Sequence, residues 1–444
     1  MSVSYLIPNN WIVAPLHLSC EIHDNLRKPI NSDERIKRIN GKNKNELYPY
    51  YGATGQVGYI DNYLTDGEYV LLGEDAAPFF DKTKNVAYLI KGKTWVNNHA
   101  HILKSLTLNN YLLHYLNYFD YRGYVTGTTR LKLTQASLKN IPIPLPPLAE
   151  QHRIVAKIEE LFTSLDKSVE TLKIAKQQLK VYRRAVLKYA FEGRLTHPDL
   201  KEGELPEGWE KTDVGSLCNV VRGGSPRPAG DPRFYNGSIP FLKVRDLTKD
   251  EKMFVLEAEF TIKEAGLTKT RLVKAGTLLL SNSGATLGVP KITAIDATMN
   301  DGVAAFLNLK CDSRYFYYFW KSKTAELRAI NQGAAQPNLN TELIKEVKIV
   351  LPKDKEAQVK IVQEIESRLS VCDKLEESIE QSLQQAEALR QSILKKAFEG
   401  KLVPQEPNDE PASVLLERIA AARQNAGPVK RTKKETFVRR KRRV

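Results

Sequence analysis

Apolar residues recur at steps of three and four positions from Leu148 to Glu192, a segment without glycine or proline. This spacing places them on one face of a helix, close to a heptad seam. Gly193 follows, and glycine is common just beyond a helix end. The segment therefore predicts a helix of about 45 residues, roughly 65 Å long. Its apolar stripe comprises Ile154, Ile158, Leu161, Leu165, Val169, Leu172, Ala175, Leu179, Tyr182, Val186 and Tyr189.

A second segment has the same spacing and ends before Gly400. Proline-containing stretches precede both segments: IPIPLPPLAEQ from Ile141 to Gln151, and VKIVLPKDKEAQ from Val347 to Gln358. Proline is tolerated in the first turn of a helix but not in its interior, so each stretch marks a helix start. The second stripe comprises Ile361, Ile365, Leu369, Cys372, Leu375, Ile379, Ala386, Leu389 and Ile393.

The two segments are copies of each other at a constant offset of 207 positions. AFEGRL (Ala190 to Leu195) returns as AFEGKL (Ala397 to Leu402), and Gln151 returns as Gln358. Upstream, LIPNNW resembles ELPEGW at an offset of 198. The chain therefore consists of two tandem units, because solenoid repeats have periods of only about 20–50 residues.

A narrow stripe of this length needs a partner to cover it. Either the two helices pair antiparallel as a coiled coil with pseudo-two-fold symmetry, or each packs on its own globular block. We favour pairing, because the stripes are too long for one small domain to cover.

Two blocks of similar size, residues 1–147 and 204–352, precede the helices. Both mix short β-type runs with turn residues. Strands are predicted at Tyr69–Leu72, Val86–Ile90, Thr277–Ser281 and Val303–Leu309, and helices at Asn110–Phe119 and Ser313–Ile330. The blocks are therefore α/β (α+β) mixtures.

The loops of both blocks are dense in polar residues, as in YPYYGATGQVG (Tyr48 to Gly58) and VVRGGSPRPAGDPRF (Val220 to Phe234). Arg, Lys, Asn and Gln read base edges, while Ser, Thr and Lys bind phosphates. Turn chemistry uses the same glycine, asparagine and serine. The number of such loops favours a nucleic-acid interface.

The net charge of +15 and the pI near 9.4 favour an anionic partner, most often nucleic acid. Residues 428–444 contain nine Lys or Arg and one Glu, which leaves a net +7 on the rest of the chain. This basic end is either a phosphate-binding arm or a solvated terminus. The four scattered cysteines, the lack of long apolar runs and the lack of a signal-peptide pattern predict a cytoplasmic protein without a membrane span.

No Walker A loop, GxGxxG context, HExxH or GxSxG motif occurs in the sequence. His99 and His101 could form a metal pair, but no third ligand is evident, and loop contacts are the simpler interpretation. Glu74 and Asp75 could be a catalytic acid pair, or a solvated or loop-bonding pair, and we favour the second. We expect no catalytic residue and no metal site.

Taken together, PPLAEQHRIVAKIEEL, AFEGRL, LPEGW and the block from Tyr50 to Ala77 resemble the DNA-specificity subunit of type I restriction–modification systems. The resemblance extends from Leu6 to Leu402, and DEPASVLLERI (Asp409 to Ile419) is similar to the short C-terminal helix of such subunits. PKDKEAQ departs from the family's pattern at the second helix, and the resemblance assigns no role to the basic end.

The resemblance implies two target-recognition domains, residues 1–147 and 204–352. Each would read one half of a bipartite double-stranded DNA site. Residues 148–203 and 353–402 would be the spacer helices, and residues 403–444 a short helix with a basic tail. DNA contacts are expected from Tyr50, Tyr51, Thr54, Gln56, Asn97, Asn98, His99, Thr128, Thr129 and Arg130 in the first block, and from Arg222, Ser225, Arg227, Lys243, Arg245, Ser281, Asn282, Gln332, Gln336 and Asn338 in the second.

The resemblance also implies partners. Two modification subunits would carry S-adenosylmethionine and methylate adenine, and restriction subunits would use ATP and Mg; this chain would bind no cofactor. Phe191 and Phe398 in the repeated helix ends either contact the modification subunits or belong to the helix caps and core. Two alternatives stay open: a methyltransferase or nuclease with its own active site, which would bind S-adenosylmethionine, and a coiled-coil scaffold, which would bind DNA without sequence preference.

Overall fold

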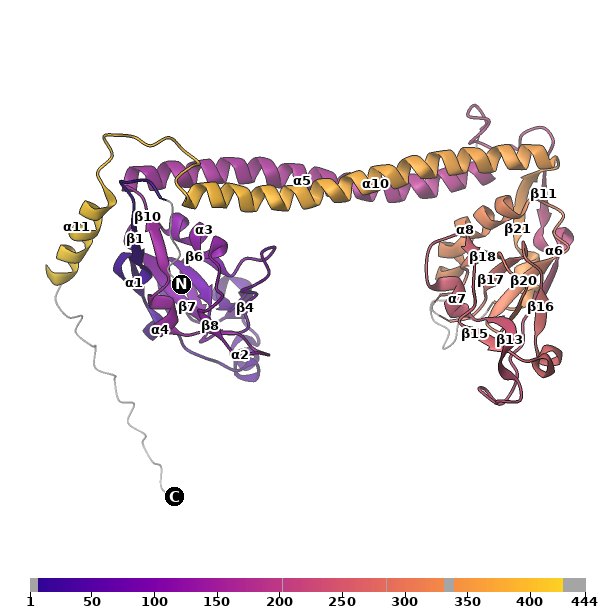
Figure 1. Cartoon of the computed structure of the whole chain (residues 1–444), viewed down its shortest axis with the longest axis horizontal. Helices are drawn as coiled ribbons and strands as arrows, with labels where there is room; N and C mark the ends of the chain where they lie inside the picture. Colours follow the sequence, from indigo (N-terminus) through magenta and orange to yellow (C-terminus); the bar gives the residue numbers. More distant parts are fainter. Residues whose placement is uncertain (1–6, 202, 285, 331–338, 426–444) are drawn as a thin grey trace, which may run out of the picture. The chain divides into compact units, whose positions relative to one another are not determined.

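The chain forms two structural units, and each of the two long helices contributes to both. The structure is a computed structural model that describes residues 7–201, 203–284, 286–330 and 339–425. Unit 1 comprises residues 1–171 and 381–444, and unit 2 comprises residues 172–380. Helix α5 spans Leu148–Phe191 and helix α10 spans Lys355–Phe398 (Figure 1). The sequence predicted both helices, and their ends fall two residues before Gly193 and Gly400.

A six-stranded sheet in the order β2-β7-β5-β6-β3-β4 forms the centre of unit 1. All neighbours are antiparallel except β3 and β6, which are parallel. The strands are β2 (Cys20–Ile22), β3 (Tyr48–Gly52), β4 (Gly55–Ile60), β5 (Thr65–Gly73), β6 (Ala87–Val96) and β7 (Ala100–Ser105). Strands β5 and β6 confirm the predicted strands at Tyr69–Leu72 and Val86–Ile90.

Two small ladders and short helices complete unit 1. β1 (Ile12–Pro15) pairs with β10 (Pro142–Leu145), and β8 (Val125–Thr126) pairs with β9 (Lys132–Leu133). The helices are α1 (Leu16–Ser19), η1 (Asp24–Leu26), α2 (Ser32–Ile39), η2 (Lys44–Glu46), α3 (Asn109–Tyr118), α4 (Gln135–Lys139) and α11 (Ala412–Asn425). α3 confirms the predicted helix at Asn110–Phe119, and α11 confirms the short C-terminal helix.

Unit 2 holds a five-stranded sheet, β12-β20-β17-β18-β14, and a four-stranded sheet, β15-β13-β19-β16. Every side chain of β17, Leu278–Ser281, is buried, as expected for a central strand covered on both faces. The other strands are β12 (Asn219–Arg222), β13 (Tyr235–Leu242), β14 (Phe254–Val255), β15 (Phe260–Ile262), β16 (Arg271–Val273), β18 (Pro290–Thr293), β19 (Ala297–Met299) and β20 (Val303–Leu307).

The remaining elements of unit 2 include a two-stranded ladder equivalent to the one formed by β1 and β10 in unit 1. β11 (Trp209–Asp213) pairs with β21 (Lys348–Pro352), just as β1 pairs with β10, so each ladder joins the start of a block to the strand before a long helix. The helices are α6 (Val214–Leu217), α7 (Val244–Thr248), η3 (Glu264–Lys269), α8 (Ser313–Ile330) and α9 (Thr341–Glu346). β17, β20 and α8 confirm the remaining predicted elements.

Within each unit, the portions of α5 and α10 that belong to it run antiparallel and are joined by ion pairs. In unit 2, Arg183 of α5 pairs with Asp373 at 2.7 Å and with Glu376 at 3.0 Å. In unit 1, Arg390 pairs with Asp166 and lies over the ring of Phe162. These contacts confirm the predicted antiparallel pair.

The seam between the helices follows the predicted stripe with four exceptions. Tyr182, Tyr189, Leu375 and Leu389 are 40–51% exposed, so their assignment to the buried stripe is wrong. An α-helix of 3.6 residues per turn drifts by about 20° per heptad relative to a 3.5 repeat. A stripe predicted with a constant heptad spacing therefore includes positions whose side chains have rotated away from the contact between the two helices.

The repeated AFEG(R/K)L ends have a structural reason. Gly193 and Gly400 have φ angles of +77° and +70°, which favour glycine. A Cβ at Gly193 would lie 2.5 Å from Pro206, and one at Gly400 would lie 2.4 Å from Pro8. In both units the helix end thus packs against the proline of the LIPNNW or ELPEGW segment, which explains why the two motifs are repeated together.

Candidate nucleic-acid interface

Four polar loops of unit 1 meet at one end of the central sheet. The nitrogen of Glu74 donates to the carbonyl of His99 at 2.8 Å, and the nitrogen of Ala76 donates to the carbonyl of Leu131 at 2.8 Å. The nitrogen of Asn97 donates to the carbonyl of Tyr51 at 3.1 Å. These bonds join the β3–β4 turn, the loop after β5, the β6–β7 turn and the β8–β9 loop into one surface, which we call the unit 1 loop cluster.

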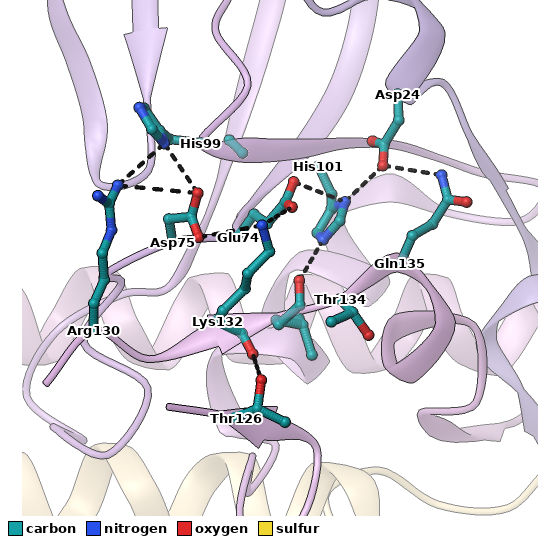
Figure 2. A network of polar contacts seen from close by, with 12 residues as sticks. Asp24, Glu74, Asp75, His99, His101, Thr126, Arg130, Lys132, Thr134 and Gln135 are labelled. Atoms are coloured by element: carbon teal, nitrogen blue, oxygen red, sulfur yellow. Dashed lines mark hydrogen bonds and ion pairs between the residues drawn. The ribbon is translucent and has the colours of Figure 1, made fainter. Parts of the chain in front are cut away.

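Glu74 and Asp75 anchor the basic residues of this cluster (Figure 2). Glu74 is 9% exposed and pairs with Arg27 and with Lys132, the latter at 3.2 Å. Asp75 contacts His99 at 3.1 Å, and Arg130 at 4.0 Å. Burial raises the pKa of Asp75, but the hydrogen bond from His99 and the charges of Lys132 and Arg130 outweigh it, so the pKa lies below its ordinary value. The loop-bonding interpretation of this acidic pair is therefore supported over the catalytic one.

Six predicted DNA-contact residues of the first block lie on exposed parts of this cluster or in the flanking turn: Thr54, Gln56, Asn98, Thr128, Thr129 and Arg130. His99 is partly exposed and its Nδ1 lies 3.4 Å from the guanidinium of Arg130. Figure 2 shows these two side chains converging on Asp75 from different loops. Sequence reasoning thus grouped residues that the fold does bring together.

Three other predicted positions point inward. Tyr50 is 4% exposed and donates its hydroxyl to the carbonyl of Ile30. Asn97 is 8% exposed and its side chain accepts from the nitrogen of His99 at 2.8 Å. Tyr51 is half-buried and stacks on Tyr88. We correct Tyr50 and Asn97 from DNA contacts to residues that shape the loops, because a buried side chain is unavailable to a base.

In unit 2, three predicted DNA-contact residues lie around Asp301, which is two residues before the start of β20. It accepts from Arg222 Nε through its carbonyl at 2.5 Å and from the hydroxyl of Ser225 through its carboxylate at 2.6 Å. Arg227, 72% exposed, lies 3.6 Å from the same carboxylate. This acidic centre with a basic rim is similar in chemistry to the one around Asp75.

The remaining predictions in unit 2 divide by exposure. Arg245 is 76% exposed and pairs with Glu259, while the ammonium of Lys243 lies 3.3 Å from the centre of the Phe260 ring. Ser281 and Asn282 are fully buried, so we correct both to structural positions; Ser281 bonds within its own loop to the carbonyl of Thr286. Gln332, Gln336 and Asn338 lie outside the described residues.

The two repeated phenylalanines belong to the core more than to the surface. Phe398 is 3% exposed and its ring contacts those of Tyr111, Tyr115 and Tyr118 in α3. Phe191 contacts Tyr315 and Phe319 in α8. For Phe398 the core interpretation is therefore supported over direct contact with a partner, because almost all of its side chain is covered by the rest of unit 1.

Beside each phenylalanine lies a cavity built from equivalent elements. The unit 1 cavity of 590 Å³ is lined by the end of α10, including Phe398 and Glu399, and by residues of α3. The unit 2 cavity of 790 Å³ is lined by the end of α5, including Phe191 and Glu192, and by residues of α8. We call them the paired clefts.

Sequence reasoning missed the acidic centres. Asp301 and the pairing of Asp75 with Arg130 and Lys132 are not evident from the sequence, because a carboxylate beside DNA-binding loops is unfavourable until its basic partners are known. The proximity of several arginines in one loop is the signal that could have indicated them, since clustered cations need a counter-charge.

Among the described residues, no group of three or more His, Cys, Asp or Glu side chains is arranged to hold a metal ion. His101 instead bonds to Asp24 and to a backbone carbonyl. No helix in the described part of the chain is long and apolar enough to cross a membrane.

The chain is similar to several known proteins. A putative type I restriction enzyme specificity subunit of Haemophilus influenzae is 28% identical over 391 residues, which cover 86% of this chain and 94% of the relative. The EcoBI specificity subunit of Escherichia coli is 29% identical over 70% of each chain. The HsdS subunit of Thermoanaerobacter tengcongensis has the same fold, with a TM-score of 0.56 at 20% identity over 89% of this chain and 98% of that one.

A solved chain of a type I restriction–modification system gives a TM-score of 0.66 at 19% identity and covers 89% of this chain and 99% of its own length. The family model of the type I restriction modification DNA specificity domain matches twice, at residues 28–179 and 206–385. Each match contains one of the loop clusters described above and part of one long helix. The chain therefore belongs to the family of type I restriction–modification specificity subunits, which recognise DNA sequence and are not themselves enzymes.

Proposed function

We propose that this chain reads a bipartite double-stranded DNA site, one half with the unit 1 loop cluster and the other with the loops around Asp301. The observation that carries the proposal is the pair of exposed basic-rimmed loop clusters, one in each specificity domain. Their residues differ, with His99, Arg130 and Lys132 in one and Arg222, Ser225 and Arg227 in the other. Two unlike readers on one chain would recognise two unlike half-sites.

We further propose that two modification subunits dock on this chain, one at each of the paired clefts. An interface used twice by the same partner has to be present twice, and the clefts are formed by the repeated helix ends. The modification subunits would carry S-adenosylmethionine, and restriction subunits bound through them would use ATP and Mg. The chain itself would contribute recognition in the cytoplasm and no cofactor.

The recognition proposal is tested by mapping methylated adenines in cells that carry this chain, its modification partner, or both. A split motif that is methylated only when both are present is the expected result. Absence of any such motif, with the partner confirmed as bound, would refute recognition by this chain. Binding of S-adenosylmethionine to the isolated chain would instead favour an enzyme, and DNA binding without sequence preference would favour a scaffold.

The docking proposal is tested with charge reversals at the rims of the clefts. Lys188→Glu alters the unit 2 cleft and Lys401→Glu the unit 1 cleft. Each is expected to reduce the number of bound modification subunits from two to one, as measured by native mass spectrometry. Lys37→Glu and Lys263→Glu are exposed controls that line neither cleft. Retention of two subunits by both cleft variants would contradict the assignment.

A further inference from the structure

We infer that His101 is held as an imidazolium inside unit 1, and that it positions the β8–β9 loop for reading the first half-site. The inference rests on the proposed function. His101 lies on β7 with its side chain fully buried. It does not reach the surface, so it acts through the residues that it holds.

The proton count follows from the hydrogen-bond partners. Nδ1 lies 2.7 Å from Oδ2 of Asp24, and Nε2 lies 2.9 Å from the carbonyl oxygen of Leu133. A carbonyl and an ionised carboxylate can only accept, whereas a neutral imidazole has one N–H to donate. Both contacts are satisfied only if both ring nitrogens carry protons. A neutral His101 would leave one buried acceptor facing an unprotonated nitrogen, which is costly.

The charges around the ring agree with this state. Asp24 also pairs with Arg27 at 3.1 Å, and Glu74 lies 3.9 Å from Nδ1 and pairs with Arg27 as well. Burial would raise the pKa of Asp24, but the hydrogen bond and charge of His101, together with Arg27, lower it below its ordinary value. The carboxylates of Asp24 and Glu74 are thus balanced by two cations, Arg27 and His101, only when His101 is charged.

Further charged groups face this cluster from the loops. Lys132 of β9 pairs with Glu74 and with Asp75, and Asp75 contacts His99 and Arg130. Lys132 and Arg130 are 48% and 60% exposed, so solvent screens them more than the inner pair. The network therefore runs from a buried cation to an exposed rim (Figure 2).

His101 fixes the base of the loop that carries this rim. Leu133 ends β9, and its nitrogen donates to the carbonyl of Glu74 at 2.8 Å while its carbonyl accepts from His101. Gln135, two residues further, donates to Asp24 at 3.0 Å. The loop between β8 and β9 contains Thr128, Thr129 and Arg130, so these bonds define where the three side chains lie.

Unit 2 provides an internal comparison. In unit 1, Leu72 of β5 faces His101, and in unit 2 the corresponding pair is Leu280 with Ala304. The nitrogen of Glu74 bonds to the carbonyl of His99, and that of Asn282 bonds to the carbonyl of Gly302. The positions of His101 and Glu74 are thus occupied by alanine and asparagine in unit 2. Any effect of the imidazolium should be confined to the first half-site.

The test uses the complete complex with its modification subunits and three DNA duplexes. One duplex carries both half-sites, one an altered first half-site and one an altered second half-site. The ratio of affinities for matched and altered DNA measures discrimination at each half-site. His101→Gln is expected to reduce discrimination about tenfold at the first half-site only, while His17→Gln, an exposed control on α1, changes neither. Equal loss at both half-sites, or no loss, would overturn the inference.

Two further readouts use the wild-type chain, so they do not depend on whether the variant folds. Nitrogen-15 NMR of labelled histidine should show one signal pair with both ring nitrogens protonated; a single-proton tautomer for every buried histidine would overturn the inference. Titration of the wild-type complex against the same three duplexes should show discrimination at both half-sites. If the wild-type complex discriminates at neither half-site, the proposed function fails, whereas the NMR result still decides the protonation of His101.

Discussion

At the scale of single residues, exposure divides the predicted contact positions. Thr54, Asn98 and Arg130 have the polar chemistry expected of DNA contacts and lie at the surface, whereas Asn97 and Ser281 have the same chemistry and lie inside. Composition identifies a polar loop, but it does not indicate which side chain turns inward to bond the backbone. That choice depends on the strands that approach from elsewhere in the sequence.

Arg130 is the exposed cation with the clearest expected role in recognition. Arg130→Ala should weaken binding to the matched first half-site by about 1–3 kcal/mol if the guanidinium contacts a base edge. Titration of complex against the three duplexes measures this loss, and Arg418→Ala, 63% exposed on α11 and outside both the loop cluster and the cleft, is the matched control. An equal loss on matched and altered first half-sites would show that Arg130 contacts phosphate and does not select bases.

His114 gives a prediction about acid stability. It lies on α3 against the ring of Phe162, and burial together with the charge of Arg390 lowers its pKa to about 4. The folded chain therefore prefers neutral His114, and this stabilisation is complete above pH 6.5 and lost as the pH falls towards 4. His114→Leu should remove up to about 3 kcal/mol of that acid-induced loss. Denaturant unfolding at several pH values measures it, and parallel curves for variant and wild type would contradict the assignment.

At the scale of elements, the helices were predictable and the sheets were not. α5, α8 and α10 follow from local spacing within one stretch of sequence, and α5 and α10 also follow from the prolines before them and the glycines after them. The order β2-β7-β5-β6-β3-β4 depends on pairings between strands far apart in the chain, such as the parallel contact of β3 with β6. The strands of this sheet are three to ten residues long, too short for their pattern alone to specify those partners.

The junction of α10 with α3 gives a prediction at this scale. Phe398→Ala removes a buried ring that contacts three tyrosines, and it should destabilise unit 1 by about 3–5 kcal/mol. Phe191→Ala should cost less, because Phe191 is only partly buried. Thermal unfolding of both variants measures the difference. A Phe398→Ala variant with wild-type stability but weakened partner binding would instead restore the contact role expected from the sequence.

At the scale of the whole molecule, the duplication links fold to function. Each copy contains the same elements, namely a first strand paired with a last strand, a long helix and a glycine at its end, while its loops and their charged centres differ. These shared elements could be predicted, because their sequence motifs occur twice in the chain. The loops could be identified as an interface, but the sequence they recognise depends on side-chain positions that only a complex with DNA defines.

The central claim is that each specificity domain recognises a different half-site and that α5 and α10 set the DNA spacer between the half-sites. Insertion of one helical turn into both helices tests this claim most directly. Four residues are inserted after Lys176 in α5 and after Glu380 in α10, which pair across the helices. The added length is about 6 Å, or about two base pairs of DNA. Methylated-adenine mapping should then find the same two half-sites with a spacer longer by about two base pairs. Methylation at the parental spacer, or a change in either half-site, would contradict the account.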